Sequence, residues 1–213
     1  MRTDELIDDL SGALAPVSRF AFYRRLVEGI GSGAVVSFLF MWMWLGMRPD
    51  LADAMTTPAY WMKFAFTFGL AVFAFRATEK LARPASRAAI PLAGIGVVFA
   101  LLLGAATMQW MKAPPAARMP LMMGHSAMVC PWLIVAVSLP IFAGTFWSLR
   151  ALAPTRPVFA GAVAGFASGA LGAWVYAFHC DESAAPFVLV FYTLGIAALS
   201  ASGALIARRL LRW

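Results

Sequence analysis

The chain has 213 residues, of which 62% are hydrophobic and only 13% are charged. Soluble globular proteins average about 45–50% apolar and about 25% charged residues, so this chain lacks the charge that would keep a surface of its size in water. The same composition, with only two cysteines, excludes a disordered protein and a disulfide-rich secreted scaffold. The remaining class is a membrane protein with several transmembrane segments.

Six long apolar stretches follow one another along the chain, each close to the roughly 20 residues that a transmembrane helix needs. We place them at residues 27–47, 58–75, 90–108, 126–149, 158–178 and 187–207. None shows the period-two alternation of a barrel strand, and prolines or charged residues mark the expected helix ends. The sequence therefore predicts an all-α protein in which a segment, residues 1–26, precedes a domain of six transmembrane helices, residues 27–213.

The distribution of lysine and arginine predicts the orientation of these helices. Of the 17 cations, thirteen lie at one end of the spans and four at the other. The larger group is Arg2, Arg19, Arg24, Arg25, Arg76, Lys80, Arg83, Arg87, Arg150, Arg156, Arg208, Arg209 and Arg212; the smaller is Arg48, Lys63, Lys112 and Arg118. Because cytoplasmic loops are enriched in these residues, both termini are expected in the cytoplasm.

The net charge of +7 is then explained by topology and by contact with anionic lipid of the bilayer. No motif for direct binding of nucleic acid is present. Lys63, near the start of the second span, lies close enough to the span end for its ammonium group to be within reach of the interface.

The first 26 residues contain the pattern of an amphipathic helix. Thr3 is a candidate N-cap, acids occupy the first turn, and Pro16 ends the pattern. The candidate partner-binding residues are Asp4, Glu5, Leu6, Ile7, Asp8, Asp9, Leu10 and Leu14. Anionic lipid would repel these acids. The segment is expected either to be a frayed tail or to dock its apolar stripe into a partner's groove, with the acids directed to a basic surface.

Both cysteines and both histidines fall at the expected outer ends of the fourth and fifth spans. Cys130 and Cys180 are equally distant from residue 155, which lies in the turn between these spans. Because the two helices form an antiparallel hairpin, the two sulfurs are expected at the same depth in the membrane. His125 and His179 are close to them in the sequence.

This cluster admits three interpretations. Each cysteine can be a small apolar core residue, with each histidine at a helix end. The two cysteines can form a disulfide in an oxidising compartment. The thiolates, imidazoles and nearby thioethers can instead bind a soft metal ion, the one cofactor that the sequence suggests. No CxxC or HExxH motif favours the metal further.

No group of residues indicates an enzyme. We find no phosphate-binding loop and no Ser/His/Asp set, and no predicted span has an acidic or basic residue near its middle, which also argues against an ion-coupled transporter. Glycines at helical spacing predict close helix packing within the chain, with a homodimer as the alternative. They are Gly161, Gly165 and Gly169 in the fifth span and Gly29 and Gly33 in the first.

Several elements of the sequence resemble the NrsF family of membrane anti-sigma factors. They are residues 1–7 (MRTDELI), 45–51 (LGMRPDL) and 58–63 (PAYWMK), Cys130-Pro131, Leu149-Arg150 with Ala153-Pro154, the glycine-spaced fifth span, His179-Cys180 and residues 209–213 (RLLRW). The resemblance covers nearly the whole chain. It implies a six-span protein of the bacterial inner membrane that negatively regulates an extracytoplasmic-function sigma factor.

In such proteins the cytoplasmic N-terminal segment holds the sigma factor at the membrane, away from RNA polymerase. Paired cysteines, here Cys130 and Cys180, are associated with sensing stress. The resemblance thus implies that residues 1–26 bind the sigma factor, and that a change at the outward-facing cysteines releases it. The alternative function is a thiol- or soft-metal-handling membrane protein that works with a periplasmic partner.

Overall fold

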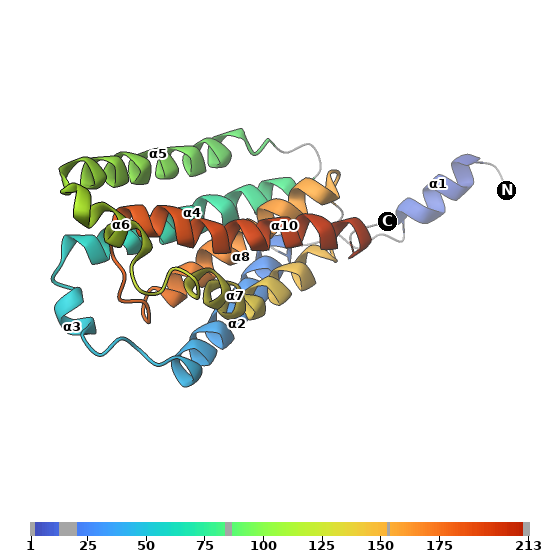
Figure 1. Ribbon diagram of the computed structural model, residues 1–213. Helices are drawn as coiled ribbons and strands as arrows, with labels where there is room; N and C mark the ends of the chain where they lie inside the picture. Colours follow the sequence, from blue (N-terminus) through green and yellow to red (C-terminus); the bar gives the residue numbers. More distant parts are fainter. Residues whose placement is uncertain (1–2, 13–20, 84–86, 153, 211–213) are drawn as a thin grey trace.

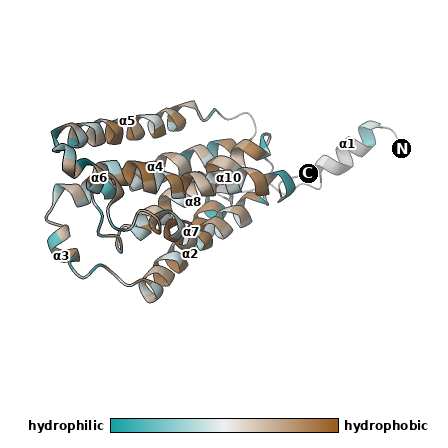
Figure 2. Cartoon of the chain, viewed as in Figure 1, coloured by the Kyte–Doolittle hydropathy of each residue, from teal (hydrophilic) through white to brown (hydrophobic). Residues whose placement is uncertain are grey.

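The computed structural model describes residues 3–12, 21–83, 87–152 and 154–210. Within these ranges the chain forms helices joined by turns and short loops, and six of the helical segments are long and apolar enough to cross a membrane. They are Tyr23–Trp44, Pro58–Leu81, Ala89–Lys112, Cys130–Leu149, Pro157–Tyr176 and Ala185–Leu210. Figure 2 shows hydrophobic residues along their length. The predicted all-α class with six candidate spans is confirmed.

Several helix ends differ from the predicted boundaries for local reasons. Helix α2 (Ala21–Trp44) ends before residue 47, because Gly46 takes the left-handed conformation, with φ at 74°, and its N–H closes the helix on the Met41 carbonyl. Helix α4 (Pro58–Leu81) continues six residues past the predicted end at residue 75. Its last turns stay helical because Glu79 forms ion pairs with Arg76 and Arg83, at 3.5 and 3.0 Å.

The last span is composite. A short turn of helix, α9 (Ala185–Phe187), is followed by one turn of π-helix, η1 (Val188–Tyr192), and then by α10 (Thr193–Leu210). Phe187, Val188 and Tyr192 are fully buried. Single π-turns inside helices are frequent at functional sites. The π-turn was not predicted, because hydropathy does not register a change of helix type.

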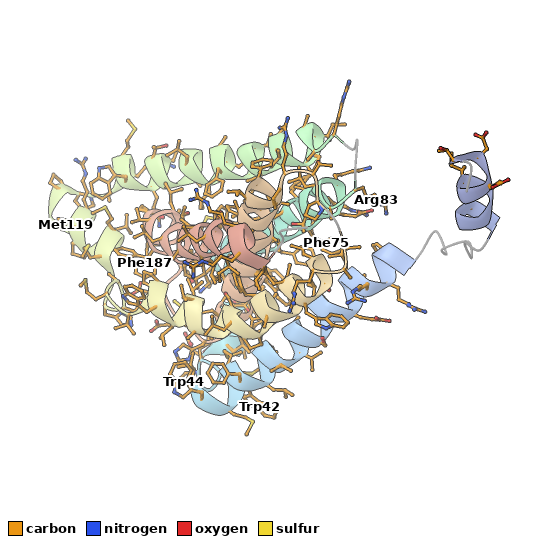
Figure 3. The ribbon with its side chains drawn as sticks, turned by 90° about the vertical axis from the view of Figure 1, so that its right-hand side faces the viewer. Trp42, Trp44, Phe75, Arg83, Met119 and Phe187 are labelled. Carbon is orange, nitrogen blue, oxygen red and sulfur yellow. The ribbon has the colours of Figure 1, made fainter. Side chains whose placement is uncertain are left out.

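Helix α8 (Pro157–Tyr176) is the centre of the bundle. It packs against α4, against α7 (Cys130–Leu149) and against α10, and more lightly against α2. Helix α2 packs mainly on α7. Helix α5 (Ala89–Lys112) lies at the periphery, beside α4 and α9 (Figure 1). Figure 3 shows Phe187 inside the bundle and Trp42 and Trp44 at its edge, and each of these tryptophans is more than half exposed.

The two ends of the bundle are built differently. One end holds the last turn of α10, lies on the side of α1 (Thr3–Gly12), and is the predicted cytoplasmic end (Figure 1). The other, the predicted outer end, has two short helices that were not predicted, α3 (Leu51–Ala54) and α6 (Pro115–Met123). Hydropathy could not indicate them because neither is long enough or apolar enough to span.

The N-terminal segment contains helix α1 (Thr3–Gly12), which has Asp4 and Glu5 in its first turn. Figures 1 and 3 show α1 standing apart from the bundle, and in Figure 1 it lies beyond the last turn of α10. The predicted partner-binding residue Leu14 lies outside the described residues.

The glycine-rich faces bring helices together inside the chain, as predicted. A Cβ atom on Gly165 would collide with the Leu199 carbonyl of α10, and one on Gly203 of α10 would collide with the Gly161 carbonyl of α8. On α2, a Cβ atom on Gly33 would lie 2.7 Å from the Pro140 carbonyl oxygen of α7. The backbones thus touch where only glycine fits, and these faces are covered within one chain rather than available for a dimer.

We expect Gly165→Leu to destabilise the bundle, because the new side chain meets a backbone carbonyl that cannot move aside. Overpacking typically costs about 1–3 kcal/mol, and we expect the upper end of this range here. The measurement is thermal unfolding of the purified protein in detergent. Gly104→Leu on α5 is the matched control, since nothing lies within 4 Å of its Cβ position. Equal unfolding temperatures for the two variants would contradict the packing described.

Candidate functional site

The predicted hairpin brings the two cysteines together at the predicted outer end of the bundle. Cys130 is the first residue of α7, and Cys180 follows the turn that ends α8. Both are free thiols and both are buried, with exposed fractions of 0% and 3%. The Cys130 thiol donates a hydrogen bond to the Cys180 sulfur. The chain therefore places two thiols in contact, although they are fifty positions apart in the sequence.

Two tyrosines complete the buried surroundings of the thiols. Tyr176 closes α8 and Tyr192 closes the π-turn, with ring centroids 6.0 Å apart. Each interacts electrostatically with both cysteines. Their exposed fractions are 2% and 0%, so bulk water is kept from this side of the sulfurs. The π-turn thus has a defined place in the site, because it positions Tyr192 beside Cys180.

The loop that contains Cys180 is held by a buried lysine. Lys63 of α4 is fully buried, and its Nζ donates hydrogen bonds to the Cys180 carbonyl at 2.6 Å and the Glu182 carbonyl at 2.9 Å. The Lys63 side chain therefore reaches the loop at this end of the bundle, where its partners are backbone carbonyls rather than water. The loop offers carbonyl oxygens at the end of an apolar bundle, and these capture the ammonium group more effectively than distant water.

A buried arginine also forms hydrogen bonds to the same loop. Arg48 donates a forked pair of hydrogen bonds to the Asp50 carboxylate, both at 2.7 Å, and its Nη1 reaches the Cys180 carbonyl at 3.4 Å. Its backbone N–H also binds the Phe178 carbonyl at 3.1 Å. The forked pair lowers the pKa of Asp50 and raises that of Arg48, so both groups stay charged.

The immediate surroundings favour the thiolate form of Cys180. The hydrogen bond from the Cys130 thiol lowers the pKa of Cys180 most, and the nearby Lys63 ammonium group acts in the same direction. Burial opposes both effects. A thiolate is the nucleophilic and metal-binding form of cysteine, so this pair can take part in disulfide exchange or soft-metal chemistry.

The two histidines do not join the sulfurs in one cluster. His179 lies with its Nδ1 at 3.0 Å from the Gly46 carbonyl, which fixes this nitrogen as the donor. His125 lies 2.8 Å from a Glu182 carboxylate oxygen and 3.2 Å from an Asp181 carboxylate oxygen. Of the four predicted sensor residues, the structure pairs the cysteines and directs each histidine to a different partner.

A pocket of about 600 Å³ connects this region to the surface of the protein. Its lining includes Arg48, His125, His179, Cys180 and Asp181. The site therefore combines two buried thiols with a pocket of polar and charged side chains that leads from the surface to Cys180.

The predicted sigma-binding residues lie at the opposite end of the molecule. Seven of the eight belong to α1: Asp4, Glu5, Leu6, Ile7, Asp8, Asp9 and Leu10. Asp4 and Glu5 are exposed, and Ile7 is 57% exposed. The candidate binding helix and the thiol site are thus separated by the length of the membrane-spanning bundle (Figure 1).

Sequence reasoning missed Lys63, Arg48, Tyr176 and Tyr192. The position of Lys63 inside a predicted span could have indicated it, because an ionisable residue in an apolar span is costly and usually has a functional or structural partner. Nothing in the sequence indicated that this partner is a backbone segment more than a hundred residues away.

Comparisons with known proteins agree over the whole chain. The family NrsF, described as a negative regulator of sigma F, matches residues 10–213. The probable anti-sigma-F factor NrsF of Azospira oryzae is 35% identical over 213 residues, and the anti-sigma-F factor NrsF of Caulobacter vibrioides is 36% identical over 214 residues. Each alignment covers 100% of both proteins. No solved structure matches this chain.

We expect Lys63→Met to loosen the Cys180 loop, because it leaves the Glu182 carbonyl without its charged donor and the Cys180 carbonyl with only the longer Arg48 contact. Hydrogen bonds to charged groups contribute about 1.5–3 kcal/mol, so the thermal midpoint in detergent should fall by several degrees. Lys112→Met is the control, since Lys112 is an exposed cation at the end of α5. If the two variants unfold alike, Lys63 does not hold the loop.

Proposed function

The chain belongs to the NrsF family of negative regulators of sigma F, and we propose that it is an anti-sigma factor of the bacterial inner membrane. In this proposal residues 1–26 bind an extracytoplasmic-function sigma factor in the cytoplasm and keep it from RNA polymerase. A stress signal at the outward-facing cysteines releases it. The role is regulatory rather than catalytic.

The observation that most supports this proposal is the match along the entire length to two relatives named anti-sigma-F factors. A match to the spans alone would support only a shared membrane domain. The aligned region includes the N-terminal segment, although the family match itself begins at residue 10. The proposed class of sigma factor rests on the resemblance of the sequence motifs.

The character of α1 supports sigma-factor binding by the N-terminal segment. The helix exposes Asp4, Glu5 and Ile7 at the end of the bundle that also holds most of the chain's cations. That distribution of cations favours the cytoplasm for this end. A helix of 10 residues is marginal in water, so binding to a groove of the sigma factor would stabilise it.

We expect Ile7→Asp to weaken sigma-factor binding at least tenfold, because an apolar anchor buried in an interface typically contributes 2 kcal/mol or more. The measurement is the affinity of the full-length protein, reconstituted in nanodiscs, for the sigma factor. Met119→Asp is the matched control, since Met119 is equally apolar and 61% exposed but lies on α6 at the other end.

An unchanged affinity in Ile7→Asp would contradict the assignment of the binding helix. If the full-length protein and a version lacking residues 1–26 handle thiols or metals equally well and neither binds a sigma factor, the alternative function is favoured instead.

For the signal we propose oxidation of the thiol pair by exchange with an external disulfide. The Cys180 thiolate attacks one sulfur of that disulfide and releases the other as a thiolate, giving a mixed disulfide. Cys130 then attacks the Cys180 sulfur, loses its proton and releases the second external thiol. Two protein thiols are oxidised, one external disulfide is reduced, and the contact between the two sulfurs supports this step.

The packing of α7 supports a route from the thiols to the N-terminal segment. Cys130 begins α7, and α7 packs along α2 through the close backbone contact at Gly33. Helix α2 follows the N-terminal segment in the chain. A bond formed at Cys130 would therefore act on the helix that leads to the sigma-binding residues.

We expect Cys130→Ser and Cys180→Ser each to abolish release of the sigma factor when cells are treated with a thiol-oxidising disulfide, because one thiol cannot complete the exchange. The measurement is transcription from a promoter that depends on the sigma factor. Repression before treatment is the control for folding. Release at the wild-type level in both variants would contradict sensing by this pair.

A further inference from the structure

Three side chains from two loops meet on the outer surface, beside the thiol pocket. His125 lies in the turn between α6 and α7, whereas Asp181 and Glu182 lie between α8 and α9. One ligand atom from each residue can be chosen so that all three lie within 4.8 Å of one another. Neither cysteine takes part in this group. We call these three residues the outer triad.

The triad brings together more acceptors than donors. The two nitrogens of His125 face a Glu182 oxygen at 2.8 Å and an Asp181 oxygen at 3.2 Å. A neutral imidazole has one N–H, and ionised carboxylates only accept hydrogen bonds. In a neutral imidazole, one ring nitrogen of His125 therefore faces a carboxylate oxygen with no hydrogen atom between them. A protonated imidazole would instead donate from both nitrogens, and its positive charge would lie between the two carboxylates.

Contacts with the backbone hold the triad in place. Glu182 accepts a hydrogen bond from the His125 backbone N–H at 2.7 Å. Its carboxylate packs against Gly124, which has φ at 51° and where a Cβ atom would collide with that carboxylate. The Lys63 ammonium group binds the carbonyls of Cys180 and Glu182, the residues on both sides of Asp181. Supporting contacts of this kind orient the ligands of metal sites.

We propose that the outer triad binds a divalent cation of the zinc class. Imidazole nitrogen and carboxylate oxygen are ligands that Zn²⁺ accepts, with water in a remaining position. Ligand atoms around tetrahedral Zn²⁺ are about 3.3 Å apart. The present contacts use different ring nitrogens of His125, and a cation would take only one of them. With one ligand atom from each residue already within 4.8 Å of the others, small movements of the exposed His125 and Asp181 side chains can bring the three ligand atoms to this spacing.

Such a cation would join the loop before α7 to the loop after α8. His125 and Asp181 both line the pocket that reaches Cys180, so the bound ion would restrict the approach of reagents to the thiols. The site goes beyond the proposed function, and it does not depend on whether a sigma factor binds at the other end.

The test is titration of the full-length protein in nanodiscs, first stripped with a chelator, with Co²⁺ as a spectroscopic probe and then with Zn²⁺. We expect one ion per chain, visible d–d bands and no thiolate-to-cobalt charge-transfer band. His125→Ala and Glu182→Gln should weaken binding at least tenfold. Cys130→Ser and Asp53→Asn, an exposed acid of α3 outside the triad, should stay within twofold of wild type.

A second measurement uses Cys130→Ser, in which Cys180 is the remaining thiol. Zn²⁺ should slow alkylation of Cys180 severalfold in this variant, and adding His125→Ala should remove that protection.

Absence of stoichiometric binding, or equal binding by His125→Ala and wild type, would overturn the proposal and leave the triad as a hydrogen-bonded ion pair only. Loss of binding in Cys130→Ser, with a charge-transfer band in wild type, would assign the metal to the thiols. Sigma-factor affinity, measured on the same samples, reports separately on the proposed function.

Discussion

The outer end of this protein depends on one interaction, the pair of hydrogen bonds from the buried Lys63 ammonium group to the carbonyls of Cys180 and Glu182. A non-helical segment at the end of an apolar bundle must satisfy its carbonyl groups within the protein. Lys63 does this from α4, and Arg48 adds a longer contact from the segment after α2. These two cations are the charged donors to the backbone of the loop on which both the thiol pair and the outer triad depend.

The hydrogen bonds from Lys63 also explain why the thiol pair and the outer triad lie side by side but remain separate sites. Lys63 binds backbone and not side chains, so the side chains of Cys180 and Glu182 remain available for other contacts. Cys180 points to the buried thiol of Cys130, whereas Asp181 and Glu182 meet His125 near the surface. Soft sulfur ligands and harder oxygen and nitrogen ligands are thereby separated, which fits different partners for each.

The sequence predicted what depends on composition and periodicity. Hydropathy located six spans, the glycine spacing predicted close packing of α8 and α2, and the hairpin argument placed the two cysteines at one depth. The parts that it did not predict depend on contacts between distant segments. Whether Lys63 points to water or to a carbonyl is decided by the Cys180 loop, and the partners of His125 and His179 are decided by loops whose course no periodicity reveals.

The central claim is that the membrane separates the two ends of the bundle, with the proposed sigma-binding helix in the cytoplasm and the thiol site outside. The most direct measurement labels single cysteines with a membrane-impermeant maleimide in spheroplasts, in a background with Cys130→Ser and Cys180→Ser. Met119→Cys on α6 and Ser11→Cys on α1 report on exposed positions at the two ends. We expect labelling of Met119→Cys in intact spheroplasts and of Ser11→Cys only after lysis. The reverse pattern would contradict the claim.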